Sequence, residues 1–295
     1  MDLRETFFDT GEVALNYAEG PPNGPPFVLL HGGAARWQYG GTLLEALAGD
    51  WHFYAPDFRG HGKSGRVPGA YLLRDYARDT AAFLAGAVKE PAVVYGHSLG
   101  GEVAVMLAAQ HPEVVRALIV GDAPLSRARH ATEEPHHRAQ NVLWHQLAGR
   151  PAQEIEPALR DMPVLVPGEA APRPARESMG EHSPWFAFQA VTLQQLDPDM
   201  LAAVLAGPDV MLAGYDPEVL LPAISCPVLL LQADALGPLQ GGVLRDDEVA
   251  LGLGRLRCAT HLRLDGIGHP LHGPPEQTPR VVEAITPFLD RVRGR

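Results

Sequence analysis

The hexapeptide Gly-His-Ser-Leu-Gly-Gly at residues 96–101 constrains the fold of this chain more than any other feature. An apolar run at residues 92–95 precedes it and predicts a buried strand, and a helix-forming run at residues 102–110 follows it. A chain that passes from strand to helix within so few residues must turn sharply. Glycines on both sides of Ser98 remove the side chains that would clash in such a turn. We therefore expect the Ser98 hydroxyl at the carboxyl edge of a sheet, beside a helix amino terminus.

A Gly-x-Ser-x-Gly sequence between a strand and a helix is typical of a nucleophile elbow, with an ordinary turn and a capping serine as the alternative. Serine is a poor nucleophile unless a neighbouring base takes its proton. His269 follows the last predicted strand and is expected at the same sheet edge as Ser98, and His272 is its main competitor. The base needs an acid that fixes its tautomer. Asp122 and Asp234 each follow a predicted strand, and both keep the order serine, acid, histidine.

Attack on a carbonyl places negative charge on the substrate oxygen, which N–H donors must stabilise. One donor is expected to be the backbone amide of Leu99, directly after the serine. The other is expected from the loop at residues 31–34, where we choose Gly33 because small residues let the backbone approach a substrate closely.

The rest of the chain predicts an α/β fold with an insertion. Strand patterns occur at residues 12–18, 27–30, 51–55, 92–95, 115–120, 227–231 and 261–264, with helices at 71–88 and 276–292. This alternation implies a mostly parallel sheet with helices on both faces. Between residues 124 and 216 it gives way to helical patches without a strand pattern, and residues 164–176 are expected to form a loop. We expect a core domain of residues 1–123 and 217–295 and a helical cap of residues 124–216.

With these residues identified, the chain resembles the α/β-hydrolase superfamily over nearly its whole length, and most closely the branch with a helical cap. The matching motifs lie at residues 31–33, 55–65, 96–101 and 268–269. The resemblance implies that Ser98 is the nucleophile, His269 the base, and the amides of Leu99 and Gly33 the oxyanion hole. Epoxide hydrolases and haloalkane dehalogenases of this branch carry aspartate at the nucleophile position, so the serine argues against both.

The acid is where this chain departs from the family pattern. The later acid usually stands about three residues beyond the small residue that ends its strand, and counting from Ala233 that position is Leu236. Some members, including certain lactonases and dehalogenases, carry the acid after the earlier strand instead, where this chain has Asp122. The resemblance therefore favours Asp122, with Asp234 as the alternative.

Composition and charge exclude several other classes. The formal charge of −11 and the lack of clustered Lys and Arg argue against nucleic acid as a partner. No apolar run approaches the length of a membrane span, and no signal peptide is visible, so we expect a cytoplasmic protein. Neither the cysteines nor the histidines at 130, 136, 137 and 145 have the spacing of a metal site, and no metal or cofactor is expected.

The expected function is hydrolysis of a carboxylic ester or lactone through an acyl-enzyme. The substrate is expected to be a small, largely apolar molecule. Four aromatic residues of the insertion are candidates for its pocket, with the core of the cap as their alternative place: Trp144, Trp185, Phe186 and Phe188. A carbon–carbon bond hydrolase, an amidase or a perhydrolase on the same fold stays open, as does a non-catalytic ligand-binding protein. The sequence leaves the oligomeric state open.

Overall fold

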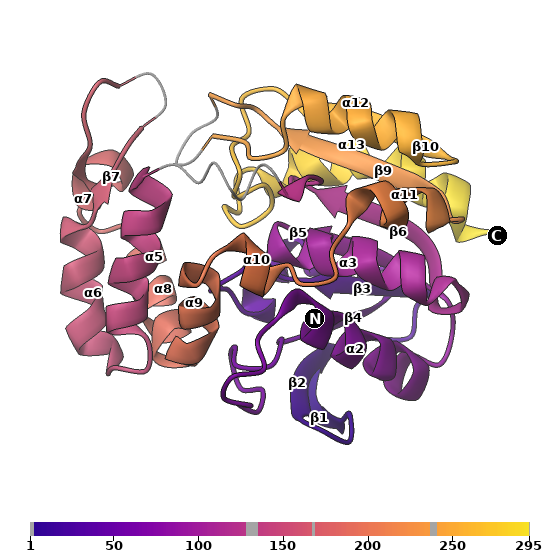
Figure 1. Ribbon diagram of the computed structural model, residues 1–295, viewed down its shortest axis with the longest axis horizontal. Coiled ribbons are helices and arrows are strands. Elements are labelled where there is room, and N and C mark those ends of the chain that lie inside the picture. The colour runs from indigo at the N-terminus through magenta and orange to yellow at the C-terminus, as the bar shows by residue number, and fades with distance from the viewer. Residues whose placement is uncertain (1–2, 128–134, 167–168, 237–240, 295) are drawn as a thin grey trace.

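The computed structural model describes residues 3–127, 135–166, 169–236 and 241–294 (Figure 1). Within them, eight strands form one sheet in the order β1-β2-β4-β3-β5-β6-β9-β10. Strands β1 and β2 pair antiparallel with each other, β2 pairs antiparallel with β4, and the other pairs are parallel. The strands are β1 (Arg4–Asp9), β2 (Ala14–Glu19), β3 (Pro26–Leu30), β4 (His52–Pro56), β5 (Ala92–His97), β6 (Val115–Gly121), β9 (Val228–Ala233) and β10 (Ala259–Leu264). The mostly parallel sheet was expected from the sequence, whereas the antiparallel edge strand β1 was not.

Helices cover both faces of this sheet. They are α1 (Gly41–Leu47), α2 (Leu73–Phe83), α3 (Leu99–Gln110), α11 (Pro217–Ala223), α12 (Asp246–Arg255) and α13 (Thr278–Arg293). Side chains alternate along β3, so Val28 packs with the core that includes α2 and α3, and Leu29 packs with the core of α1 and α13. Burial on both faces explains why the central strands are continuous apolar runs.

The segment between β6 and β9 contains a second group of helices. Figure 1 shows them beside the end of the sheet: α5 (Pro135–Leu147), α6 (Ala152–Asp161), α7 (Ala175–Met179), α8 (Pro184–Gln194), α9 (Pro198–Leu205) and α10 (Pro208–Met211). The expectation that this segment has no strand was wrong, because β7 (Pro163–Val164) and β8 (Arg173–Pro174) pair antiparallel. Strands of two residues that contain proline are too short to produce an alternating pattern.

Buried polar contacts hold the loop after β4 in place. Arg59 is fully buried, and its guanidinium forms an ion pair with Asp79, with Nε 2.6 Å from Oδ2. Asp57 is also buried and accepts a hydrogen bond from the backbone amide of Trp37 at 2.7 Å. The buried carboxylates are thus satisfied by donors, which makes this loop a rigid support.

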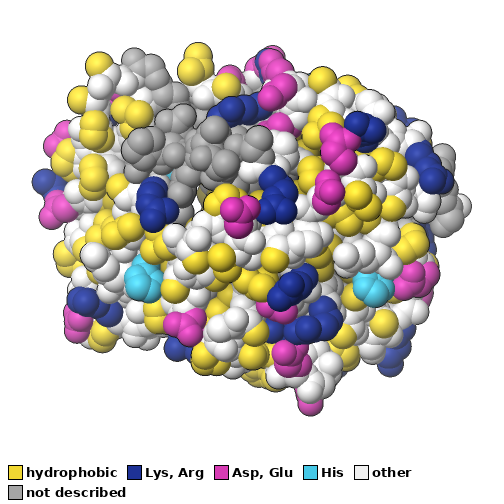
Figure 2. Space-filling view, in the orientation of Figure 1, with side chains coloured by type: hydrophobic (Ala, Val, Ile, Leu, Met, Phe, Trp, Pro, Cys, Tyr) yellow, Lys and Arg dark blue, Asp and Glu magenta, His cyan; other side chains and the backbone are white. Residues whose placement is uncertain are grey.

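The surface carries both signs of charge. On the face shown in Figure 2, basic and acidic side chains are interspersed among apolar ones. Among the described residues, no helix has the length and apolar character needed to cross a membrane.

Candidate active site

The turn between β5 and α3 holds Ser98 in a strained conformation. Its backbone has φ 53° and ψ −121°, a region that L-residues rarely adopt. A Cβ on Gly96 would lie 2.1 Å from the carbonyl oxygen of Gly100, and a Cβ on Gly100 would lie 2.3 Å from the carbonyl oxygen of Leu30. Both positions therefore require glycine, and the packed turn presents Ser98 at the carboxyl end of β5, before α3.

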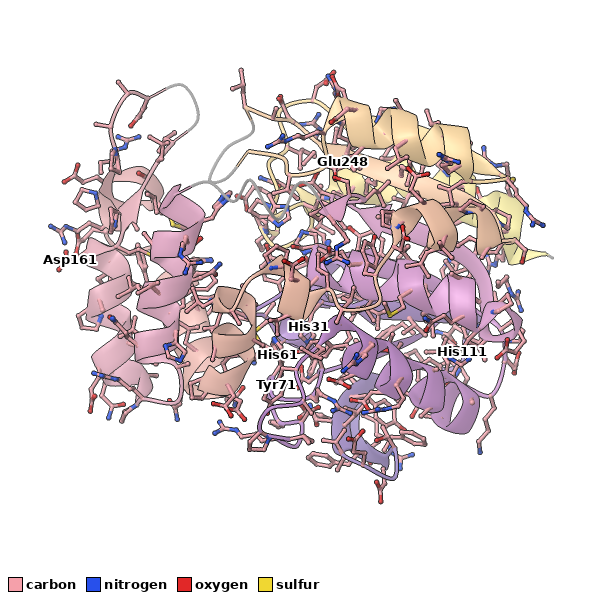
Figure 3. The ribbon with its side chains drawn as sticks, in the orientation of Figure 1. His31, His61, Tyr71, His111, Asp161 and Glu248 are labelled. Atoms are coloured by element: carbon pink, nitrogen blue, oxygen red, sulfur yellow. The ribbon has the colours of Figure 1, made fainter. Side chains whose placement is uncertain are left out.

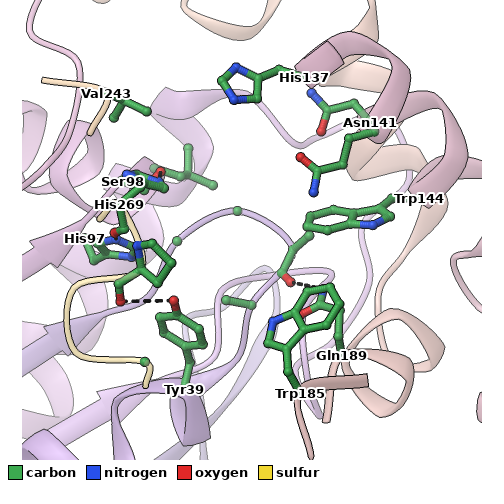
Figure 4. A pocket seen from close by; sticks show the side chains of 18 of the residues that line it. Tyr39, His97, Ser98, His137, Asn141, Trp144, Trp185, Gln189, Val243 and His269 are labelled. Atoms are coloured by element: carbon green, nitrogen blue, oxygen red, sulfur yellow. Dashed lines mark hydrogen bonds between the residues drawn. The ribbon is translucent and has the colours of Figure 1, made fainter. Parts of the chain in front are cut away.

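His269 lies between Ser98 and Asp122 (Figure 4 shows Ser98 and His269 on the cavity wall). Its Nε2 is 3.2 Å from Ser98 Oγ, and its Nδ1 is 2.6 Å from Asp122 Oδ2. A carboxylate can only accept, so Nδ1 carries the proton. Nε2 is then left with its lone pair facing the serine hydroxyl, which is the tautomer that a general base requires.

Backbone amides hold the Asp122 side chain, which is fully buried. Oδ1 accepts from the amides of Ala233 and Leu244, at 3.1 and 3.2 Å, and Oδ2 accepts from the amide of Val243 at 2.9 Å. Asp122 itself has φ 44°, so the chain turns abruptly after β6. Several donors compensate the burial of a charge, and they fix the carboxylate in place against His269.

The segment after Asp122 is anchored from α12. The buried carboxylate of Glu248 accepts hydrogen bonds at Oε1 from the amides of Leu125 and Ser126, both at 2.9 Å (Figure 3 labels Glu248). Its Oε2 accepts from the amide of Arg245 at 3.1 Å. One side chain thereby links the turn that carries Asp122 to the start of α12.

Asp234 and His272, the alternatives for the acid and the base, have other hydrogen-bond partners. Asp234 accepts hydrogen bonds from the amides of Leu236, at 3.0 Å, and Gly266, at 2.8 Å, and these bonds lower the pKa of its carboxyl group. His272 is fully buried, and its Nδ1 is 2.9 Å from the hydroxyl of Tyr95. Burial lowers the pKa of His272 to about 3, so the ring is neutral.

Two residues that the sequence analysis did not select hold the loop that carries His269. His97 Nε2 donates to the carbonyl oxygen of His269 at 2.8 Å, and the Tyr39 hydroxyl donates to the carbonyl oxygen of Pro270 at 3.1 Å (Figure 4). Burial lowers the pKa of His97 well below its usual value, so the ring is a neutral donor. The sequence signal for His97 was its place next to Ser98, while Tyr39 stands in no motif.

The loop after β3 lies against the turn that carries Ser98 and Leu99. A Cβ on Gly33 would lie 3.9 Å from Leu99 Cδ2, and a Cβ on Gly32 would lie 3.3 Å from Ser98 Cβ, so the loop after β3 runs against the elbow. In the described part of the chain, neither the amide of Gly33 nor that of Leu99 has a hydrogen-bond acceptor. Backbone N–H groups without an acceptor are suited to bind an oxyanion.

A cavity of about 1100 Å³ opens in front of Ser98 and His269. Trp144 from α5 and both Trp185 and Phe188 from α8 line it (Figure 4 labels both tryptophans). The expectation that Phe186 contributes to this wall was wrong. Phe186 is fully buried among the helices, and the Arg160 guanidinium lies 4.9 Å from its ring centroid. Adjacent positions on a helix point about 100° apart, and at Phe186 this turn directs the ring into the packing between helices and away from the cavity.

The histidines of the insertion do not form a recognisable metal site where they can be described. Across the described ranges, no group of three His, Cys, Asp or Glu residues could hold a metal ion. His130 and the side chain of His136 lie outside the described residues. His137 and Asn141, which sequence reasoning had not assigned to a pocket, line the cavity wall opposite Ser98 (Figure 4).

Comparison with known proteins agrees with this architecture. The model of the α/β hydrolase fold family matches residues 25–158. The chain is 36% identical over 105 residues to a serine hydrolase-like protein of Danio rerio, which covers 35% of this chain and 32% of that protein. It is 32% identical over 114 residues to a 2-(acetamidomethylene)succinate hydrolase of Mesorhizobium japonicum, and this match covers 39% of this chain and 41% of that protein. The matches thus span less than half the length of these curated relatives.

Similarity to solved structures extends over the whole fold. An esterase from Thermogutta terrifontis matches with a TM-score of 0.70 at 22% identity, covering 98% of this chain and 99% of that one. At this identity the likeness shows the fold alone. The sheet order, the matched family segment and these similarities show that the chain has the α/β-hydrolase fold.

Proposed function

We propose that this protein is a serine hydrolase that cleaves a carboxylic ester or lactone bond through an acyl-enzyme. The observation that carries the proposal is the continuous hydrogen-bond chain from Ser98 Oγ through His269 to Asp122, 3.2 and 2.6 Å long in its two links. In this assignment Ser98 is the nucleophile, His269 the general base and Asp122 the acid that orients it, rather than Asp234.

The first half of the proposed reaction forms the acyl-enzyme. As Ser98 Oγ attacks the carbonyl carbon, its proton passes to His269 Nε2, and the carbonyl electron pair moves onto oxygen. The amides of Gly33 and Leu99 stabilise that oxyanion, while Asp122 stabilises the imidazolium. When the tetrahedral intermediate collapses, the bond to the leaving alkoxide breaks, and the alkoxide takes the proton from Nε2.

The second half returns the enzyme to its starting state. A water molecule gives a proton to His269 Nε2 while its oxygen attacks the acyl carbon, and the same amides bind the new oxyanion. Collapse breaks the bond to Ser98 Oγ, which recovers the proton from Nε2 as the carboxylic acid leaves. The atoms balance without a cofactor or metal.

The aromatic lining of the cavity favours a small, largely apolar substrate. Its aromatic wall of Trp144, Trp185 and Phe188 faces the site from the insertion. In the proposal residues 124–216 form a cap over a core of residues 1–123 and 217–295, and the cap supplies most of the surface that selects the acyl or alcohol group.

A substrate panel tests the reaction class. Purified protein is assayed with p-nitrophenyl esters of increasing acyl length, lactones, anilides and β-diketones, beside Ser98→Ala and the control Ser178→Ala, a serine that lines the same cavity. We expect turnover of esters or lactones by wild type and by Ser178→Ala, and none by Ser98→Ala. Turnover confined to anilides or β-diketones would replace the ester assignment by an amidase or a carbon–carbon bond hydrolase. Ligand binding without turnover would support a non-catalytic protein.

A further inference from the structure

We propose that Gln189, on helix α8 of the insertion, is a positioning residue for the oxyanion hole. It holds the loop of residues 31–36, here called the oxyanion loop, in the conformation that points the Gly33 amide at the substrate. This inference rests on the proposed function, because it assumes that Ser98 attacks a carbonyl and that Gly33 binds the resulting oxyanion.

The residue after Gly33 has an unfavourable backbone conformation. Ala34 has φ 49°, in the left-handed region where a Cβ is strained and glycine is preferred. Such a conformation persists only where the surroundings hold it in place. Since the conformation of Ala34 sets the course of the chain on leaving Gly33, whatever stabilises it also positions the Gly33 amide.

The Gln189 side chain makes the contact that does this. Its Nε2 donates a hydrogen bond to the carbonyl oxygen of Ala34 at 3.2 Å (dashed in Figure 4). Both residues are buried, with exposed fractions of 5% for Gln189 and 4% for Ala34, so water does not readily replace the bond. The donor comes from an element 155 positions away, which ties the oxyanion loop to the insertion.

A second pair of contacts fixes the end of the same loop to the same helix. Arg36 Nε donates to Thr192 Oγ1 at 3.1 Å, and the Arg36 guanidinium lies 4.5 Å from the ring centroid of Phe188. Phe188, Gln189 and Thr192 fall within about one turn of α8, so one helix face holds the loop from Ala34 to Arg36.

Gln189 also lines the cavity, so loss of activity on its replacement could reflect a lost substrate contact. The two roles differ in one respect. If Gln189 acts by stabilising the left-handed Ala34, then glycine at position 34, which adopts that conformation without strain, makes the hydrogen bond less necessary. A lost substrate contact would not be restored by a change at position 34.

The experiment measures the rate of fluorophosphonate labelling of Ser98, with kcat and KM on an ester, in Gln189→Met, Ala34→Gly and the double variant. Methionine keeps the length of the side chain and removes the donor. We expect Gln189→Met to lower kcat and the labelling rate by about 10- to 100-fold with little change in KM, as misplacement of an oxyanion donor does. The double variant is expected to recover most of this loss.

Gln194→Met is the matched control. Gln194 lies on the same helix, but its Oε1 accepts from the amide of Ala152 within the insertion, at 3.0 Å. We expect it to label at the wild-type rate. Wild-type labelling by Gln189→Met, or a double variant as slow as Gln189→Met, would overturn the positioning role. A wild type that forms no adduct at Ser98 would instead overturn the proposed function, and with it this role.

Discussion

The Asp122 carboxylate reaches His269 across an intervening strand. Its Oδ2 lies 2.6 Å from His269 Nδ1, although Asp122 follows β6, His269 follows β10, and β9 lies between these strands in the sheet. The amide of Ala233, at the end of β9, donates to Asp122 and so helps to fix it. Asp234, directly after β9, instead accepts from the amide of Gly266, in the loop that leads to His269. Strand β9, which pairs with β10, thus ends in an amide that fixes Asp122, and strand β6, one strand farther from β10, leads into the acid partner of His269.

The two aspartates are therefore expected to differ strongly on replacement. Asp122→Asn should lower kcat by about 10³- to 10⁴-fold, because the amide cannot hold His269 in the required tautomer. It should also destabilise the fold by about 1–3 kcal/mol, since the amide replaces a carboxylate oxygen that accepts buried N–H groups. Asp234→Asn should change kcat by less than about threefold, within the range of a surface substitution. Steady-state kinetics and urea unfolding of both variants check this, and equal losses of activity would contradict the assignment.

The loop that carries His269 gives a second prediction. His97→Phe keeps a ring but removes the hydrogen bond to the His269 carbonyl oxygen, and we expect kcat to fall about tenfold because small displacements of a base are costly. His97→Gln, which keeps a donor, should recover part of the rate. Tyr39→Phe should show a similar, smaller loss through the adjacent carbonyl of Pro270. Wild-type kcat in His97→Phe would show that the loop holds its conformation without this bond.

Trp185 and Phe186 are adjacent in sequence but are expected to have different roles. Phe186→Ala removes a fully buried ring and should destabilise the protein by about 3–5 kcal/mol. Trp185→Ala should leave stability closer to wild type and should raise KM for bulky esters, because Trp185 lines the cavity. Urea unfolding and KM measurements on the two variants separate these effects. If Phe186→Ala raised KM and Trp185→Ala destabilised the protein, the assignment of Trp185 to the pocket would be wrong.

Buried neutral histidines make stability depend on pH. Burial lowers the pKa of His31 to about 4 and that of both His61 and His272 to about 3 (Figure 3 labels His31 and His61). Unfolded histidine takes up a proton as pH falls through about 6.5, while the folded rings stay neutral, so the unfolded state binds more protons. The free energy of unfolding should therefore fall from pH 6.5 toward pH 4, by up to about 1.4 kcal/mol per pH unit for each histidine.

Urea unfolding between pH 8 and pH 4 measures this dependence. His272→Gln removes one of the groups and should give a shallower slope than wild type. A free energy of unfolding that stays constant between pH 8 and pH 4.5 would contradict the burial of these rings.

Much of the fold was predictable from sequence because the central strands are buried on both faces and so appear as apolar runs. The turn at Ser98 was predictable because steric limits at residues 96 and 100 permit only glycine. Strand β1 was missed because its alternation is that of an exposed edge, where Phe7 is 58% exposed.

The choice between Asp122 and Asp234 could not be made from chain order, since both follow strands that end at the same edge. Their side chains differ in which backbone amides they face, and that depends on contacts between segments far apart in sequence. The same holds for Gln189, whose partner Ala34 lies in a loop that the helix pattern of residues 184–194 says nothing about.

The most direct test of the account is intact-mass measurement after treatment with a fluorophosphonate. This reagent phosphonylates a serine whose hydroxyl is activated by a base and faces an oxyanion hole, with fluoride as the leaving group. We predict one adduct on wild type and on Ser178→Ala, and none on Ser98→Ala. A folded wild type that gains no mass, or a Ser98→Ala variant that still forms the adduct, would contradict the assignment of Ser98 as the nucleophile.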